Sequence, residues 1–447
     1  MLRTSKTILY PNKNISSYDY DELLRQMNQA KILYNQLLFI ARQTYFSRIN
    51  KPNIDDSYLD TFNIRNWDDI LDKNGKPTKQ KISNPFTFIY LLKKLKESNN
   101  FMDINLNSKV QQAICKKVST DWKSFEQLKH YAKSKNINGL AKIPKYKTTY
   151  CMTEYNKGNI FKKALRNQLL ILSGMKNGVK IPNFIHSENI QSARVLFKNE
   201  QLILEIMYNV EENKPTKNTG IVAGIDVGLD TLFAITFNKI GLNPILIKNK
   251  KMKADNQLYN KKLAKYRSLL SIDQKSSKRI KRIVTKRNNQ MDYGRHMTTK
   301  RTVEMLLKAN VEKVIIGWNK NIKSNIKLGK RTNQNFTQIP FAKLIETLKY
   351  KLESEGIIVE IVEESYTSKS SVLSGDSLPE YKKEANNSLK FSGNRLKRGL
   401  YEDKTYGKIQ ADINGSYNIL RKSGLETEEI VRIARENKKQ GLGIKVN

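Results

Sequence analysis

The sequence is poor in the residues that build disulfides and metal-thiolate sites. Its 447 residues include two cysteines, Cys115 and Cys151, and neither belongs to a C-x-x-C pair. A disulfide framework and a cysteine-ligated zinc site are therefore both unsupported, and a reducing cytoplasm is the expected location. The three histidines, His130, His186 and His296, are scattered along the chain and are interpreted as surface or structural residues.

Long apolar runs are also missing. No stretch reaches the roughly 18 apolar residues that a membrane-spanning helix requires, so we expect no membrane partner. The first residues, MLRTSKTILYPNKN, lack the apolar core of a signal peptide. The glycine-rich nucleotide-binding motifs, H-E-x-x-H and G-x-S-x-G are absent too, which argues against ATP-driven, nicotinamide-dependent and serine-hydrolase chemistry.

Acidic residues are outnumbered by basic ones. Lys and Arg total 81 against 42 Asp and Glu, which gives a formal net charge of +39. An excess this large favours a polyanionic partner, because neutralising phosphates releases counterions. Fifteen Lys and Arg but only two acids fall between Lys248 and Arg287, where Leu and Ile recur at helical spacing. We predict a basic helix or helix pair within 248–300 that contacts phosphates, although a solvated helix face would carry the same pattern.

The character of the sequence changes twice along the chain. After a short N-terminal strand, apolar residues at spacings of three and four indicate an amphipathic helix from Leu23 to Ala41, with the apolar face in the core. Further helical patterns make residues 17–140 a mostly helical region. Alternating segments beyond it favour antiparallel strands, with a hairpin turn at KNEQ. Polar residues 211–220 are interpreted as a linker, after which strands alternate with helices, as in an α/β sheet domain.

Four carboxylates stand at the ends of apolar segments. Asp226 interrupts the buried-strand pattern GIDVGLDTLFAITF, Glu363 and Glu364 follow the strand IIVEIV, and Asp412 begins a helix. Burying an unpaired carboxylate is costly, whereas Mg²⁺ prefers oxygen ligands. Two ions about 4 Å apart clamp the attacking water and the leaving oxygen in two-metal phosphodiesterases. A lone aspartate more often caps a helix or pairs locally, so these residues alone leave a metal site and local pairing equally open.

The order of three segments resembles TnpB, the RNA-guided nuclease family encoded by insertion sequences and related to type V CRISPR effectors. GIDVGLDTL is similar to its first RuvC motif, and ADINGSYNI to its third motif, D-x-N-x-x-x-N-I. FAKLIETLKYKLESEGIIVEIVEESYTSKSS is similar to the stretch that leads to the Y-T-S signature. The match covers residues 218–422, and ILYNQLL and IPKYK in the N-terminal half match more weakly. The three segments in this order are specific, whereas any one of them is not.

The resemblance implies a multidomain α+β protein. It would contain a β-barrel-like, oligonucleotide-binding-like wedge domain, a helical recognition domain inserted into it, and an RNase H-like (RuvC) α/β nuclease domain. The expected bounds are 1–16 with 141–217 for the wedge, 17–140 for the recognition domain, 218–424 for the nuclease with a loop at 366–408, and 425–447 for a C-terminal tail.

The resemblance also implies an activity, an RNA-guided DNA endonuclease of a transposable element. Its site would hold two Mg²⁺ ions, or Mn²⁺ in their place, on Asp226, Glu363 or Glu364, and Asp412. The implied partners are a guide RNA from the element's own end and double-stranded DNA with a short adjacent motif, which the protein reads while base pairing reads the rest. A monomer in a prokaryotic cytoplasm is favoured. The expected nucleic-acid contacts are Lys278, Arg279, Lys281, Arg282, Lys286, Arg287, Arg395, Lys397 and Arg398.

The sequence departs from the family pattern in its expected zinc site. Many members carry C-x-x-C pairs after Y-T-S, and these pairs form a zinc ribbon. Here Ser371 and Ser374 occupy the positions of the first pair, and no cysteine supplies the second. We therefore predict no zinc, and a basic loop built around Arg395, Lys397 and Arg398 in its place.

A second departure concerns the glutamate of the second motif. It usually follows the strand VEKVII, where this chain has Gly317 and Trp318. Glu363 and Glu364 end the next strand, which in an RNase H-like sheet lies about 4.8 Å away. We expect one of the two to supply the missing acid. Successive strand residues face opposite ways, so only one can point at the metals, and the sequence does not say which.

Two other functions remain open at this stage. The missing glutamate favours a nuclease-dead relative that acts as an RNA-guided DNA-binding repressor, whereas Asp226 and Asp412 favour the nuclease. The charge alone would also suit an unguided RNA-binding protein. Binding that follows a guide sequence would separate the repressor from the unguided protein.

Overall fold

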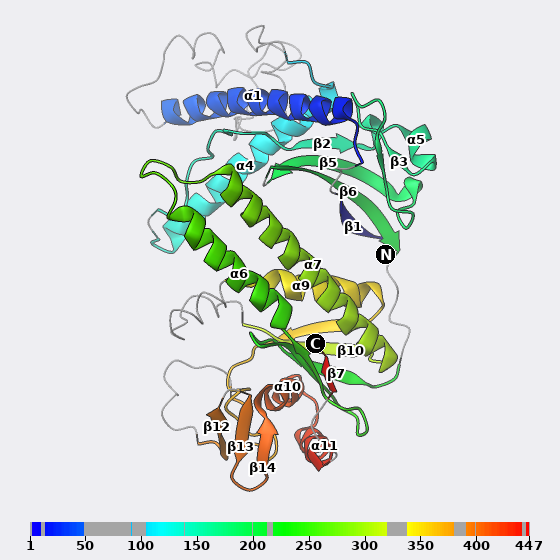
Figure 1. The fold of residues 1–447 in the computed structure, drawn as a ribbon, viewed down its shortest axis with the longest axis vertical. Helices are drawn as coiled ribbons and strands as arrows, with labels where there is room; N and C mark the ends of the chain where they lie inside the picture. The colour runs from blue at the N-terminus through cyan, green and yellow to red at the C-terminus, as the bar shows by residue number, and fades with distance from the viewer. Residues whose placement is uncertain are drawn as a thin grey trace, which may run out of the picture. The chain divides into compact units, whose positions relative to one another are not determined.

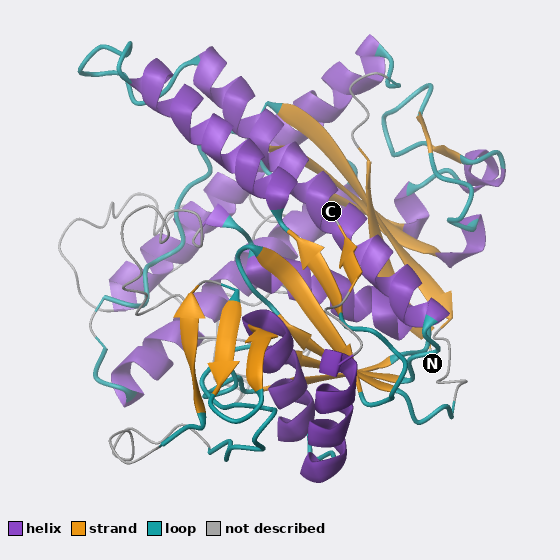
Figure 2. Cartoon of the chain, turned by 60° about the horizontal axis from the view of Figure 1, so that its bottom comes forward, coloured by secondary structure: helices purple, strands orange, loops and turns teal. Residues whose placement is uncertain are grey.

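The structure is a computed structural model that mixes helices and strands (Figures 1 and 2). It describes residues 2–9, 14–48, 91, 104–137, 139–198, 200–211, 218–319, 338–379, 390–397, 399–439 and 444–446. The chain forms two compact units, Met1–Glu211 and Glu212–Asn447. Most of the predicted linker, residues 212–217, lies outside the described residues.

The N-terminal unit combines two long helices with a four-stranded antiparallel sheet. Its elements are β1 (Leu2–Leu9), α1 (Ser17–Arg48), α4 (Ser108–Ser134), β2 (Thr153–Asn156), η2 (Lys157–Asn159), α5 (Lys162–Arg166), β3 (Leu169–Leu170), β4 (Val179–Lys180), η3 (Ser187–Asn189), β5 (Ile190–Lys198) and β6 (Gln201–Glu211).

The strands of this sheet run in the order β1-β6-β5-β2. β1 pairs with β6 along its whole length, so the start of the chain lies beside residues that follow both long helices in the sequence. β5 and β6 form the predicted hairpin, with Lys198 opposite Gln201. Among the described residues the sheet is open, with β1 and β2 at its edges, so the expected barrel-like closure is not seen there.

The apolar stripe predicted in the first helix lies in the core of this unit. The whole stripe is buried, namely Leu23, Met27, Ala30, Tyr34, Leu37 and Ala41. The spacing of three and four residues places these side chains on one face of α1, and that face packs against α4 and the sheet. The expected core role is confirmed. Of the helical pattern between residues 49 and 103, only Leu91 is described.

The C-terminal unit is built on a six-stranded mixed sheet. Its elements are β7 (Val222–Asp226), β8 (Thr231–Phe237), β9 (Ile245–Lys248), α6 (Lys250–Arg267), α7 (Lys278–Lys308), β10 (Lys313–Gly317), α9 (Phe341–Ser354), β11 (Ile358–Val362), β12 (Gly393–Lys397), β13 (Leu400–Asp403), β14 (Gly407–Gln410), α10 (Ala411–Lys422), α11 (Thr427–Lys439) and β15 (Ile444–Val446).

The sheet order β11-β10-β7-β8-β9-β15 joins two kinds of pairing. β7, β8 and β9 are antiparallel neighbours, whereas β10 and β11 continue the sheet parallel to β7. Alternate residues face opposite sides. Val314 and Ile316 of β10 therefore join a core with α7 and α9, while Ile315 joins a second core with α10 and α11. The two helical layers bury both faces of the sheet, as the apolar runs of its strands require.

Two regions differ from the sequence expectation. The loop expected at 366–408 contains β12 and β13, which together with β14 form a small antiparallel sheet, here called the ribbon (residues 393–410). The expected tail at 425–447 contains α11 and the edge strand β15, which pairs with β9. Ile430 and Ile433 of α11 are buried at the helical spacing of three residues. This spacing indicates a packed helix, which the prediction of a tail did not take into account.

The predicted basic helix pair is α6 and α7. The two helices pack together, with Arg279 over the ring of Tyr266 and Arg287 over the ring of Tyr259. None of the helices among the described residues has the length and apolar character needed to cross a membrane.

Candidate active site

Three of the predicted carboxylates converge on one edge of the six-stranded sheet. Asp226 is the last residue of β7, Glu364 follows β11 by two residues, and Asp412 is the second residue of α10. β7, β10 and β11 are parallel, so their carboxyl ends meet at the same edge. The neighbouring positions predicted for β10 and β11 are confirmed.

Two of the three carboxylates have raised pKa values. Burial raises the pKa of Asp226 to about 8, with further contributions from the negative charges of Asp412 and Glu364 and an opposing effect of Arg395. Burial likewise raises the pKa of Glu364 to about 7, and the charge of Glu363 adds to this shift. Because each unit of pKa corresponds to about 1.4 kcal/mol, the cluster is unfavourable when every member is ionised.

The structure separates the two adjacent glutamates. Glu363 is exposed, accepts a hydrogen bond from Lys422 at 2.9 Å and another from the hydroxyl of Ser365. Its slight burial is outweighed by these donors, so its pKa is lowered. Glu364 instead lies close enough to Asp226 to raise the pKa of that residue. Glu364 is therefore the member of the pair that belongs to the cluster.

Small residues let α10 lie directly on β7. A Cβ at Gly224 would stand 2.6 Å from the carbonyl oxygen of Ser416, so no other residue fits that strand position without displacing the helix. The Ser416 hydroxyl donates to the Gly224 carbonyl at 2.8 Å. A Cβ at Gly415 would stand 3.0 Å from Oδ2 of Asp226. The glycines thus bring the first turns of α10, and with them Asp412, next to Asp226.

Packing explains why a glycine, Gly317, stands at the position of the expected glutamate. A Cβ there would stand 2.8 Å from Cγ1 of Ile419 on α10 and 3.6 Å from Cβ of Glu364. Ile419 is fully buried, so a side chain at residue 317 would have to displace the side chain of Ile419 within a packed core. The glycine leaves space that Ile419 fills, while Glu364 approaches from the neighbouring strand.

Asp412 is held by side chains from two directions. Its Oδ2 accepts hydrogen bonds from the hydroxyl of Thr231 at 2.7 Å and from Nε2 of Gln410 at 2.8 Å. Thr231 itself accepts from Lys248 at 2.9 Å. On the other side, Nη2 of Arg395 lies 3.6 Å from Oδ1 of Asp412. Arg395 was predicted only as a nucleic-acid contact, and its place beside a candidate ligand could not be derived from the sequence.

The asparagines of the third motif bind the Y-T-S segment. Asn414 donates to the Ser370 carbonyl at 2.8 Å and accepts from the Val372 amide at 2.9 Å. Asn418 donates to the carbonyls of Thr367 and Ser370 at 2.9 and 2.7 Å. Both asparagines are fully buried. The two motifs are therefore one hydrogen-bonded unit, residues 366–376 against α10, and this segment is called the motif turn below.

The donor set suits a hard divalent cation in its chemistry. It consists of carboxylates from three separate elements, which is the ligand type that Mg²⁺ and Mn²⁺ prefer. Within the described residues, no three Asp, Glu, His or Cys side chains lie close enough together to hold a single ion as they stand. Binding would therefore require the carboxylates to draw together.

The predicted nucleic-acid contacts fall into three groups. Exposed side chains on the first turns of α7 are Lys278, Arg279, Lys281, Arg282 and Lys286, and four of these border a hollow of about 560 Å³. Arg287 differs, because its guanidinium donates to Asn256 at 2.8 Å and to the Gln338 carbonyl at 2.6 Å. On the ribbon, Arg395 and Lys397 are exposed, and Arg398 lies outside the described residues.

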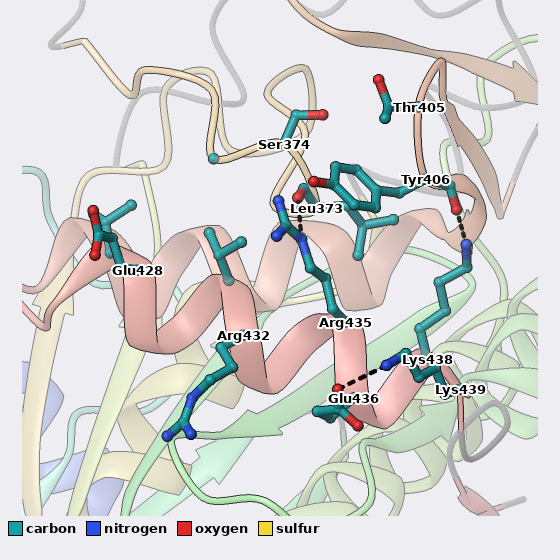
Figure 3. A pocket seen from close by; sticks show the side chains of 13 residues that line it. Leu373, Ser374, Thr405, Tyr406, Glu428, Arg432, Arg435, Glu436, Lys438 and Lys439 are labelled. Atoms are coloured by element: carbon teal, nitrogen blue, oxygen red, sulfur yellow. Dashed lines mark hydrogen bonds and ion pairs between the residues drawn. The ribbon is translucent and has the colours of Figure 1, made fainter.

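A larger hollow, of about 1050 Å³, lies between α11 and the turns that carry Ser374 and Tyr406 (Figure 3). Two of the basic side chains that line it, Arg435 and Lys438, already have partners within the protein. Arg435 donates to the Leu373 carbonyl at 2.9 Å and stacks 3.9 Å above the ring of Tyr406, and Lys438 donates to the Tyr406 carbonyl. None of the predicted site residues lines this hollow. It marks the seam where α11 packs against the ribbon.

Comparison with known proteins gave no match among curated sequences. Among solved structures, a complex of Cas12f1 with single-guide RNA and target DNA is 16% identical, covers 93% of this chain and 98% of its own, and has a TM-score of 0.33. The mini RNA-guided endonuclease CRISPR-Cas phi3 is 11% identical, with 95% and 92% covered and a TM-score of 0.43. TM-scores below 0.5 do not establish a common fold.

Two family models match the sequence itself. Residues 205–323 match a family described as "Probable transposase", OrfB of IS605, and residues 341–419 match the TNB domain of Cas12f1-like proteins. The first match contains Asp226 and the second contains Glu364 and Asp412. With the order of the three motifs, the two matches confirm the resemblance of this chain to the TnpB family.

Proposed function

We propose that this chain is an RNA-guided DNA endonuclease of a transposable element. Its active site for the hydrolysis of phosphodiester bonds would consist of Asp226, Glu364 and Asp412. One observation carries the proposal, the convergence of these carboxylates from a strand, a turn and a helix, where burial, with the charges of Asp412 and Glu364 adding to it, raises the pKa of Asp226 to about 8. Structural carboxylates are ordinarily paired. A repulsive group of this kind is typical of a site that awaits a cation or a substrate.

Two Mg²⁺ ions would be held by Asp226, Glu364 and Asp412, and when bound they would polarise the phosphate and activate a water. The protein's own contribution is orientation. Thr231 and Gln410 both donate to Oδ2 of Asp412, which fixes the carboxylate on its helix turn. Because a ligand that is fixed in advance loses little freedom on binding, this support favours the bound state.

Arg395 would contact the scissile phosphate. Its guanidinium stands beside Asp412 and remains 46% exposed, so it can reach a phosphate oxygen that approaches the carboxylates. Arginine binds phosphate through paired N–H donors and keeps its charge at any working pH. In the proposed complex it would offset the negative charge that the carboxylates place next to the DNA backbone.

The charge of the chain supports nucleic-acid partners. The net charge of +39 and the exposed cations at the start of α7 would bind phosphates irrespective of sequence. The matches to a transposase family and to a Cas12f1-like domain favour a guide RNA from the element's end and DNA with a short adjacent motif. The sheet order, three antiparallel strands continued by two parallel ones, supports an RNase H-like nuclease domain that begins near residue 218 and includes α11 and β15.

A nuclease-dead repressor is the second candidate, and Gly317 is the observation that favours it. The support that Gly317 gives to the repressor is weakened by Glu364, which follows β11 and lies next to Gly317. Cleavage separates the two candidates, since both would bind guided DNA.

The decisive experiment starts with protein purified from cells that carry its native locus. The bound RNA is sequenced, and DNA that matches its guide is incubated with the complex, with and without Mg²⁺. Guided cutting that requires Mg²⁺ is expected. Guided binding without cutting would identify the repressor, and RNA binding without any effect on matching DNA would refute both.

A further inference from the structure

Asp403 is a buried carboxylate with every oxygen engaged by a donor. It ends β13 and is 1% exposed. Its Oδ2 accepts from the hydroxyls of Ser371 and Ser374, the second at 2.6 Å, and its Oδ1 accepts from the backbone amides of Thr405 and Tyr406 at 2.9 and 2.8 Å. Burial raises the pKa of this carboxyl, but the four hydrogen bonds outweigh it and leave the pKa lowered. Asp403 is thus an ionised hub between the motif turn and the ribbon.

Asp376 links the motif turn to Ser392, the residue directly before the ribbon. Its Oδ2 accepts from the amides of Ser371 and Ser392 at 2.8 and 2.9 Å, and its Oδ1 accepts from the Ser392 hydroxyl at 2.5 Å. The phenol of Tyr401 on β13 also donates to the Lys369 carbonyl at 2.7 Å. The ribbon is therefore held on the motif turn by polar contacts in addition to the apolar packing of Tyr401 and Ile409.

The ribbon in turn supplies two of the groups that surround Asp412. β14 runs directly into α10, and Gln410 at the junction accepts from the Ile413 amide at 2.7 Å while it donates to Asp412. Arg395 on β12 approaches Asp412 from the other side. A ribbon that shifted on the motif turn would carry both groups away from the carboxylate that they orient.

We infer that Asp403 is a positioning residue of the candidate active site: its carboxylate, shared by Ser371 and Ser374, holds the ribbon so that Gln410 and Arg395 meet Asp412. The inference rests on the proposed function for its activity readout. The inference can also be tested without nucleic acid or metal. Loss of the hydrogen bonds to Asp403 should increase backbone hydrogen exchange in the ribbon and in the first turn of α10.

The first test compares Asp403→Asn with Glu402→Gln. Glu402 is the neighbouring residue on β13, and its carboxylate is exposed and 3.9 Å from Lys408, so it receives the same chemical change outside the hub. Single-turnover guided cleavage by Asp403→Asn should fall by about 10- to 100-fold, the usual cost of losing a group that orients a ligand. Guided DNA binding should stay within about 2-fold of the unchanged protein, and Glu402→Gln should match the unchanged protein in both.

The second test is hydrogen exchange of the metal-free protein without nucleic acid. Asp403→Asn should raise exchange at residues 393–397 and 411–414 and leave residues 222–226 of β7 as protected as before. Ser374→Ala, which removes a single donor to Asp403, should produce the same pattern with smaller amplitude. It serves as the measurable variant if Asp403→Asn does not fold.

Three results would overturn the inference. One is unchanged cleavage by Asp403→Asn, and another is a loss of cleavage that disappears when the assay is cooled well below the melting temperature of the variant. The third is exchange that rises uniformly over the C-terminal unit, since that would show a general loss of stability. If the unchanged protein does not cleave at all, the proposed function fails, while the exchange pattern still decides whether Asp403 positions the first turn of α10.

Discussion

The C-terminal unit contains two pairs of partly or fully buried carboxylates whose surroundings differ. Asp403 and Asp376 accept hydrogen bonds from hydroxyls and backbone amides on every oxygen, and the pKa of Asp403 is lowered. Asp226 and Glu364 face other carboxylates, and burial with like charge raises their pKa values to about 8 and about 7. A carboxylate is thus stabilised as an anion at Asp403 in the ribbon, whereas the ionised form is unfavourable at Asp226 and Glu364 at the sheet edge.

This difference indicates what each group does. A carboxylate whose donors come from the protein is complete and serves the fold, because nothing further has to bind to it. A carboxylate whose burial and like-charged neighbours outweigh its donors, as for Asp226 and Glu364, lowers stability unless a cation arrives. Burial alone does not separate the two cases, whereas the balance of donors and like charges around each carboxylate does. The comparison leads to five predictions, from the largest expected effect to the smallest.

The largest effect should come from the carboxylates of the sheet edge. Asp226→Ala and Asp412→Ala should each abolish guided cleavage, a loss well beyond the roughly 100-fold of a supporting residue. RNA-guided DNA binding should remain largely intact, because neither change removes a phosphate contact. Cleavage is measured with Mg²⁺ and binding by gel shift on the same preparation. Normal cutting by either variant would refute the assigned site.

Glu363→Gln and Glu364→Gln sharpen the comparison within one pair of neighbours. Glu364→Gln should reduce guided cleavage to the level of Asp226→Ala, because Glu364 is the acid that faces Asp226. Glu363→Gln should stay active, because Glu363 faces Lys422. Each variant is the control for the other. Full activity of both would end the idea that Glu364 replaces the missing glutamate.

The sequence predicted the parts of the site that depend on pattern along the chain. Strand ends and helix starts located Asp226 and Asp412, and strand neighbourhood located the glutamate pair. It did not predict which glutamate turns inward, because that depends on Lys422 and on the approach of β11 to β7. It also missed Asp403 and the role of Arg395, since contacts between segments far apart in the chain leave no local period. The spacing of Ser371 and Ser374 predicts the absence of a zinc site, but it does not predict that both hydroxyls donate to Asp403.

The pH dependence of stability should distinguish the two groups directly. The folded, metal-free protein holds a proton on Asp226 up to a pH of about 8, whereas the unfolded chain releases it near pH 4. Stability should therefore fall as the pH rises through this window, by up to about 1.4 kcal/mol per pH unit for each such group. The melting temperature in chelator should be lower at pH 8 than at pH 6.

Two variants control that measurement. Asp226→Asn should reduce the dependence between pH 6 and 8, and the part that remains should come from Glu364, whose pKa is raised to about 7. Asp403→Asn should leave the slope unchanged, since a lowered pKa means that the stability from Asp403 is complete above about pH 4 and is lost only in stronger acid. A slope in Asp226→Asn as steep as that of the unchanged protein would show that Asp226 does not cause it.

A smaller effect is expected from the basic start of α7. Replacing Lys278, Arg282 and Lys286 together by Gln should weaken RNA binding and reduce its salt slope by about one for each lost phosphate contact. Arg287→Gln is the control, because its guanidinium is already bound to Asn256 and Gln338. It should lower the melting temperature and leave the salt slope unchanged. Equal salt slopes for the unchanged protein, the triple variant and Arg287→Gln would remove α7 from the proposed interface.

The smallest effect should be that of zinc removal. The hydroxyls of Ser371 and Ser374 on the motif turn donate to Asp403 on the ribbon, so this place already holds an anion with its donors and offers no thiolate for zinc. The two cysteines lie in the other unit, buried among apolar side chains, and burial raises the pKa of Cys115 to about 12 and that of Cys151 to about 11. Elemental analysis should find far less than one zinc per chain, and a zinc-selective chelator should change neither the melting temperature nor cleavage once Mg²⁺ is restored. Asp403→Asn, which breaks the hub, shows in the same melting assay that damage to the ribbon is detectable. One tightly bound zinc per chain would mean that hydrogen bonds to carboxylates do not hold the ribbon by themselves.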